Sequence, residues 1–141
     1  MHGVEPLDPL TRAAEVIGER WSLLLVDALL TGPRRFGELQ EAIPGIASNV
    51  LTDRLRRLER AGVLVGTAYS NRPPRLRYEL TAHGAELAGV LRLLAQWGAG
   101  QPDTGEGLTH QACGTPVEAR WWCPTCDRSV SDEEASELRF V

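Results

Sequence analysis

Apolar residues in the first hundred positions recur at the spacing of three and four that marks helices with one buried face. The pattern predicts a first helix over residues 10–17, with Pro9 in its opening turn and Gly18 at its end. It predicts a second helix that stops before Gly32 and Pro33. The inward positions of this second helix are expected to be Trp21, Leu24, Leu25, Ala28 and Leu29.

Two further helices are predicted on either side of the turn signal Pro44-Gly45. The first covers residues 35–43, and the second covers residues 47–61 and ends at Gly62, a natural carboxy-terminal cap. Two helices joined by a tight turn, the second of them rich in arginine, are typical of a helix-turn-helix. The apolar stripe of the second helix is expected to be Leu51, Leu55 and Leu58.

Two runs with strand character follow, at residues 63–69 and 76–80. Residues 70–75 between them are expected to form an irregular loop, because Pro73 and Pro74 stand side by side. A hairpin with a basic tip directly after a helix-turn-helix is a wing. The second run should turn apolar side chains to one face and charged ones to the other, namely Leu76, Tyr78 and Leu80 against Arg77 and Glu79.

A last helix, capped by Thr81, is more apolar than one small domain can cover, so we expect it to pack against a partner. Ala88 and Leu93 widen its apolar surface beyond one stripe. The residues of that stripe are Leu87, Val90, Leu91, Leu94 and Trp97.

The predicted fold is mainly α with a small β-hairpin, a winged helix-turn-helix, plus a small carboxy-terminal zinc-ribbon-like module. The winged domain is expected over residues 8–98 and a linker over residues 99–107. The module would occupy residues 108–130, and residues 131–141 would form an acidic tail that either binds a partner or is simply solvated.

Composition and charge are those of a globular protein with a locally basic surface. Hydrophobic residues make up 43% of the 141 positions and charged residues 24%, which excludes a disordered chain. Neither a membrane-crossing run nor a signal peptide is present, so a cytoplasmic location without membrane contact is expected. The net charge is −4, yet nine arginines face only four acidic residues within positions 34–77, a local charge of +5. Basic charge is therefore concentrated in the helix-turn-helix and wing, as DNA binding requires.

All three cysteines lie in the last third of the chain, which argues against a disulfide framework. With one histidine they form two pairs of three-residue spacing, which predicts a structural zinc site because zinc accepts three thiolates and an imidazole in a tetrahedron. So short a segment also needs a staple to fold. The alternatives are a ribbon that has lost its metal and a thiol pair open to oxidation. Residues 117–122 would be a strand between the pairs, and the predicted ligands are His110, Cys113, Cys123 and Cys126.

Several phrases of the sequence, in their order, resemble the HxlR-type regulators over roughly residues 8–98. The resemblance implies a winged-helix fold, a dimer built by the terminal helices, and operator binding near a promoter. Many members of that family carry a thiol before a proline ahead of the first helix, but this chain has Asp8 there, so thiol sensing at that position is excluded. The phrases are IGERWSLL (17–24), GPRRFGEL (32–39), PGI (44–46), LTDRL (51–55), PPR (73–75), YELT (78–81) and WG (97–98).

The first turn and outward face of the arginine-rich helix are the parts that reach base edges in a helix-turn-helix. We expect base-edge contacts from Ser48, Asn49 and Thr52. Bases or phosphates are expected to be contacted by Arg54, Arg56 and Arg57. Arginines of the wing would follow phosphates or enter a narrow minor groove. These are Arg72 and Arg75.

Some of these assignments have a second interpretation. Asp53 either accepts a hydrogen bond from a cytosine amino group or pairs with Arg56 or Arg57 along the helix. The helix arginines could equally form a solvated face, and the wing arginines an exposed loop held by prolines.

Together these features predict a sequence-specific DNA-binding transcriptional regulator, a repressor that binds a palindromic operator in double-stranded DNA as a homodimer. The alternative is a zinc- or redox-responsive sensor whose carboxy-terminal cysteine cluster controls DNA binding. An enzyme is not expected, because His2, His83 and His110 have no acid–base or nucleophilic partners at suggestive spacing. The sequence leaves room for a small-molecule effector but does not identify one.

Overall fold

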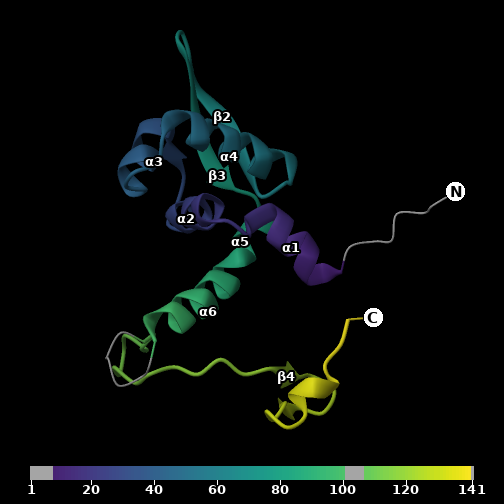
Figure 1. Cartoon of the computed structure of the whole chain (residues 1–141). Helices are drawn as coiled ribbons and strands as arrows, with labels where there is room; N and C mark the ends of the chain where they lie inside the picture. Colours follow the sequence, from purple (N-terminus) through teal and green to yellow (C-terminus); the bar gives the residue numbers. More distant parts are fainter. Residues whose placement is uncertain (1–7, 101–106, 141) are drawn as a thin grey trace, which may run out of the picture. The chain divides into compact units, whose positions relative to one another are not determined.

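The computed structural model describes residues 8–100 and 107–140, and its ribbon is drawn in Figure 1. The chain forms two compact units, with the boundary between Arg92 and Leu93. Most of the linker predicted at residues 99–107 lies outside the described residues. The elements up to the boundary are α1 (Pro9–Ile17), α2 (Arg20–Leu29), β1 (Arg34–Arg35), α3 (Phe36–Ala42), α4 (Ser48–Arg60), β2 (Leu64–Asn71), β3 (Pro74–Leu80), α5 (Ala82–Ala85) and the first part of α6 (Leu87–Ala99).

Several helices begin at side chains that accept hydrogen bonds from amides with no partner inside the helix. Asp8 caps α1 by accepting from the amide of Thr11 at 3.1 Å, and Pro9 occupies the first helical position. Glu19 caps α2, and Thr81 caps α5. The opening turn predicted at Pro9 and the cap predicted at Thr81 are confirmed.

The core of the first unit gathers apolar stripes from the helices and from the start of β2. The prediction for α2 is wrong at one position, because Leu24 is 39% exposed while Ser22 and Val26 are buried. Residues 23–26 are apolar on every side, so the pattern alone does not decide which face turns inward. The stripe predicted for α4 is at most 3% exposed and consists of Leu51, Leu55 and Leu58.

The wing is longer than the sequence predicts. β2 and β3 pair antiparallel up to Asn71 and Pro74, so only Arg72 and Pro73 connect them. The irregular loop expected over residues 70–75 is therefore wrong. Two prolines fit a hairpin here because Pro73 occupies the turn and Pro74 is the first residue of its strand. In Figure 1 the hairpin extends past the helices of the first unit.

The two faces of β3 alternate as predicted at its core end. Tyr78 and Leu80 pack against the core, and Arg77 and Glu79 are exposed. Leu76 is 43% exposed, because it lies farther along the wing, beyond the reach of the helices.

A short strand that the sequence did not predict, β1, completes a three-stranded sheet of order β1-β3-β2. Arg34 pairs with Tyr78 and Arg35 with Arg77. The β2–β3 register shifts at Tyr69, which is the extra residue of a β-bulge. The bulge lies where the wing leaves the body of the unit.

The single helix predicted after Thr81 is interrupted at Glu86, which separates α5 from α6. The backbone of Glu86 keeps a right-handed helical conformation, so the interruption is local. On α6 only Leu91 is buried, at 9% exposure. The other large apolar side chains of α6 are 44–84% exposed apart from half-buried Leu87, and they are Val90, Leu93, Leu94 and Trp97.

The second unit contains a two-stranded hairpin, β4 (Trp122–Cys123) and β5 (Arg128–Ser129), and a 3-10 turn, η2 (Ala135–Glu137). The strand predicted over residues 117–122 is wrong except at its last residue. The amide of Val117 instead donates to the carbonyl of Leu108 at 2.9 Å and closes a loop around the first ligand pair.

The acidic tail is joined to this hairpin by one ion pair. The guanidinium of Arg128 donates to both carboxylate oxygens of Glu134, at 2.7 and 2.8 Å. This hydrogen bonding, supported by the amide of Ser131, lowers the pKa of Glu134 to about 2. Within the ranges that the structure describes, no helix is long and apolar enough to span a membrane.

Candidate nucleic-acid interface

Helices α3 and α4 and the turn between them form a helix-turn-helix, with α4 against β2 of the wing (Figure 1). Gly45 in the turn has a φ of 84°, a left-handed conformation that glycine adopts without a steric penalty. Ile43 and Ile46 on either side are 1% and 8% exposed. The turn is therefore anchored in the core, which fixes the angle between the two helices.

A side-chain bond joins the two helices at the start of α4. The amide Nε2 of Gln40 in α3 donates to the hydroxyl of Ser48 at 2.7 Å. Ser48 is exposed, and its own proton is free to be donated outward. Sequence reasoning missed Gln40, because eight positions separate the partners and no local spacing rule connects them.

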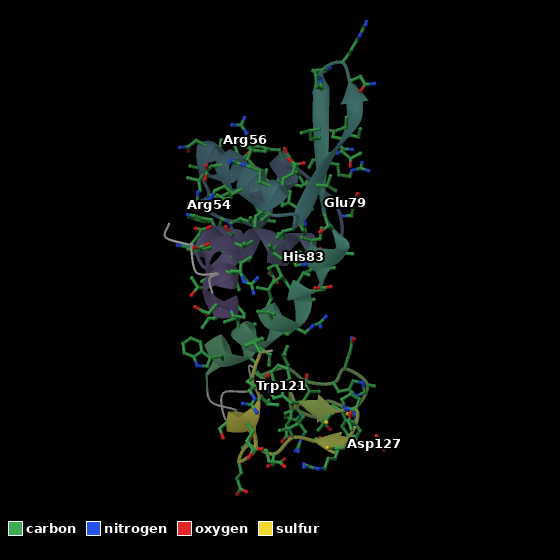
Figure 2. The ribbon with its side chains drawn as sticks, turned by 90° about the vertical axis from the view of Figure 1, so that its right-hand side faces the viewer. Arg54, Arg56, Glu79, His83, Trp121 and Asp127 are labelled. Carbon is green, nitrogen blue, oxygen red and sulfur yellow. The ribbon has the colours of Figure 1, made fainter. Side chains whose placement is uncertain are left out.

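The outward face of α4 is polar and open to solvent. Asn49, Asp53, Arg56 and Arg57 are exposed, and Thr52 is half-buried. Figure 2 labels Arg56 on the outer side of the helix. Among the described residues, the guanidinium of Arg56 has no hydrogen bond or ion pair. Its donors are thus available for a phosphate or a guanine edge.

Asp53 pairs along its own helix. Its Oδ2 lies 3.8 Å from Nη1 of Arg57, one turn later, and accepts a hydrogen bond from Arg54. This is the intrahelical pairing that the sequence allowed, and it holds the Arg57 guanidinium over the outward face.

Arg54 is directed into the protein rather than outward. Its Nε donates to Oε1 of Glu19, the cap of α2, at 2.9 Å. The same oxygen accepts from the amide and the hydroxyl of Ser22, both at 2.6 Å. The Arg54 side chain is 21% exposed. The recognition helix is therefore braced against α2 by a charge-assisted network.

The brace is kept at neutral pH because Glu19 stays ionised. Partial burial opposes ionisation, but hydrogen bonds from Ser22 and Arg54 outweigh it and lower the pKa of Glu19 to about 2 from 4.5. A depressed carboxylate pKa stabilises the fold above the ordinary value and loses this contribution as the pH falls toward the lower one. The stabilisation is thus complete at pH above about 5.

Removing the brace should weaken DNA binding without removing a phosphate contact. We expect Arg54→Ala and Glu19→Gln to lower operator affinity by similar factors, and the double variant to lose less than the product, because both break one interaction. The slope of log affinity against log salt should match the wild type. Fluorescence anisotropy across a salt series measures both quantities, with Arg56→Ala as the matched variant that should flatten the slope. A slope that falls by about one phosphate contact in Arg54→Ala would show that Arg54 touches DNA instead.

The wing carries free basic side chains at its tip and a fixed base. Arg72 and Arg75 are exposed, and neither forms a hydrogen bond or ion pair with another described residue. At the base, the guanidinium carbons of Arg35 and Arg77 lie 4.5 and 5.5 Å from the ring centroid of Tyr69. Cation–π contacts of this length attract, so Tyr69 ties together all three strands of the sheet. No sequence pattern predicted this cluster, because it depends on the unpredicted β1 and on the bulge.

The predicted metal ligands lie in the second unit as two pairs. Sγ of Cys113 is 3.5 Å from Nδ1 of His110, and Cys123 and Cys126 flank the turn of the β4–β5 hairpin. Within residues 8–100 and 107–140, no three or more His, Cys, Asp or Glu side chains are grouped as they would be around one ion. The pairs are formed, but they are not joined.

A buried helix-turn-helix with an arginine-rich outer face and a basic two-stranded wing defines a winged helix-turn-helix DNA-binding protein. The chain belongs to the HxlR-like helix-turn-helix family, whose family model matches residues 16–106. The resemblance noted in the sequence is thereby confirmed.

Proteins similar to this chain are transcriptional regulators. An HTH-type transcriptional regulator of Mycobacterium tuberculosis is 36% identical over 124 residues, which cover 85% of this chain and 78% of the relative. The structure of the redox regulator HypR in its reduced form matches with a TM-score of 0.63 at 31% identity, over 70% of this chain and 98% of HypR. That of the HTH-type transcriptional regulator YtcD matches with a TM-score of 0.63 at 35% identity, over 69% and 99%. The chain is therefore a DNA-binding transcriptional regulator.

Proposed function

We propose that this regulator is a cytoplasmic repressor that binds an inverted-repeat operator as a homodimer, with one α4 in each of two successive major grooves. The exposed polar face of α4 beside a basic wing carries this proposal. Arg54 acts inside the protein as a brace. Bases are contacted by Ser48, Asn49, Thr52 and Asp53, and phosphates by Arg56, Arg57, Arg72 and Arg75.

The apolar face of α6 supports the homodimer. Val90, Leu94 and Trp97 are spaced by four and three residues, so they share one side of the helix, and they are 44%, 45% and 84% exposed. Between α1 and the start of α6 lies a cavity of about 460 Å³, lined largely by apolar side chains such as Val16 and Leu87. A second copy of the chain fits this surface, because a two-fold dimer presents its two recognition helices to an inverted repeat.

The wing has a direct test. Replacing Arg72 and Arg75 with Ala should weaken binding to all DNA sequences and flatten the salt dependence, because each lost phosphate contact removes roughly 0.9 from the slope. With two wings per dimer, the slope should fall by about 3 to 4. Anisotropy titrations from low to high salt measure this, with Arg92→Ala, an exposed arginine on α6, as the control. Wing variants that bind as tightly as the wild type with an unchanged slope would refute the assignment.

A second candidate function is a sensor whose input is the cysteines of the second unit. HypR is described as a redox regulator. In this chain all three thiols lie in the carboxy-terminal unit, with Cys113 and Cys126 exposed. A peroxide would oxidise Cys123 and Cys126 to a disulfide, consuming one peroxide and releasing two molecules of water or the corresponding alcohol and water. Operator affinity that is the same before and after peroxide treatment would exclude this candidate.

A further inference from the structure

We propose that His110, Cys113, Cys123 and Cys126 bind one structural zinc ion, and that this ion joins the two ligand pairs of the second unit. The proposal goes beyond DNA binding and does not depend on it. It rests on the backbone of the two pairs, on one ligand–ligand distance and on the burial within the unit.

Both pairs lie on the same kind of turn. The amide of Gly114 donates to the carbonyl of His110 at 2.6 Å, and the amide of Asp127 donates to the carbonyl of Cys123 at 2.8 Å. In each case the residue after the second ligand bonds back to the first ligand. That residue is also left-handed in both turns, with φ of 71° at Gly114 and 54° at Asp127.

The match between the turns is not explained by their sequences. Residues 110–114 read HQACG and residues 123–127 read CPTCD, so they share little beyond the spacing of the predicted ligands. Asp127, labelled in Figure 2 at the β4–β5 hairpin, adopts a positive φ that is uncommon for residues other than glycine. Two unrelated pentapeptides with one backbone geometry indicate a shared requirement, namely two side chains aimed at one point.

The first pair has the separation of two ligands on one zinc ion. Zn–S bonds of about 2.3 Å and Zn–N bonds of about 2.0–2.1 Å at a tetrahedral angle place sulfur and nitrogen about 3.5 Å apart. The distance from Sγ of Cys113 to Nδ1 of His110 is 3.5 Å. This pair therefore fits the metal, with Nδ1 as the coordinating atom.

The second unit lacks the apolar core that would hold it together otherwise. No described residue between 107 and 140 is buried, and Trp121 and Trp122 are 68% and 59% exposed. So small a unit is folded by a disulfide, a metal or a partner rather than by burial. A Cys123–Cys126 disulfide would close only one turn, whereas an ion that binds both pairs would connect residues 110–113 to the β4–β5 hairpin.

The donor set selects zinc and fixes its role. Three thiolates and one imidazole form a tetrahedral site that suits zinc. Four protein ligands leave no open position for water or substrate, so the ion is structural. Binding energy then becomes folding energy of the unit.

Metal analysis of the full chain, purified without chelator, tests the proposal, and about one zinc ion per chain is expected. Cys123→Ser and His110→Ala should each reduce the zinc content well below one, while His110→Cys should retain it, because four thiolates also bind zinc tetrahedrally. His83→Ala, which removes an exposed histidine of the first unit, is the control and should not change the zinc content.

Substitution of Co²⁺ keeps the test valid where a variant folds poorly. Titration of the metal-free chain with Co²⁺ should produce thiolate-to-metal absorption and the visible bands of a tetrahedral site, with band positions that shift in His110→Cys. Zinc content near zero together with no Co²⁺ absorption would overturn the proposal. So would full zinc content in Cys123→Ser or in His110→Ala.

Discussion

Replacing Val90 and Leu94 with Asp is expected to dissociate the homodimer and to weaken operator binding by about 10²- to 10⁴-fold. The two side chains lie one turn apart on α6 and are 44% and 45% exposed in the single chain. A charge at each position would have to be desolvated in the dimer. Once the two DNA-binding units are separate, binding to the second half-site loses the effective concentration that the dimer supplies, which multiplies affinity by about 10²–10⁴.

Sedimentation equilibrium and DNA anisotropy on the same preparation measure the two effects. Ala95→Asp adds the same charge to a different, exposed face of α6 and should remain dimeric. A Val90→Asp/Leu94→Asp protein that is still dimeric would show that another surface forms the dimer. A monomer with wild-type affinity would show that dimerisation does not matter for binding.

The second large effect is expected from Gly84→Ala, which should destabilise the first unit by about 3 kcal/mol, at the upper end of overpacking. A Cβ on Gly84 would lie 2.0 Å from the carbonyl oxygen of Val63. That oxygen cannot move easily, because it accepts the amide of Thr81 at 3.0 Å at the point where the wing meets α5. The backbone of one of these elements must therefore shift.

Thermal unfolding measures this, and a loss of about 3 kcal/mol lowers the midpoint of a domain of this size by roughly 12–24 °C. Gly37→Ala in α3 is the matched control, since nothing lies within 4 Å of its added Cβ. It should raise stability by about 0.5–1 kcal/mol, because alanine favours a helix more than glycine does. Equal midpoints for the two variants would contradict the contact between α5 and β2.

Elements whose signal is local could be predicted from the sequence. The stripe of Leu51, Leu55 and Leu58 defines the inner face of α4, and the outer face follows from the helical repeat. The wing was recognised but drawn too short, because the rule that prolines interrupt strands does not apply at the turn or at a first strand position. Leu24 was misplaced because its neighbours are apolar on every side.

Contacts between distant residues could not be predicted in this way. Glu19 and Arg54 are 35 positions apart, and only the packing of α4 on α2 brings them to 2.9 Å. Arg54 was expected at DNA because its residue type and helix position suited it, and the structure gives it a partner inside the protein. Similarly, the ligand spacing predicted two pairs in the second unit, but no spacing rule determines how the pairs meet.

Selection of binding sites from random double-stranded DNA tests most directly whether α4 reads sequence. The full chain should enrich an inverted repeat whose half-sites lie about 10 base pairs apart, centre to centre, or a multiple of that. Asn49→Ala/Thr52→Ala/Arg56→Ala should bind DNA weakly and lose that sequence preference. Enrichment of the same repeat by this variant, or no enriched sequence for the wild type, would contradict the account.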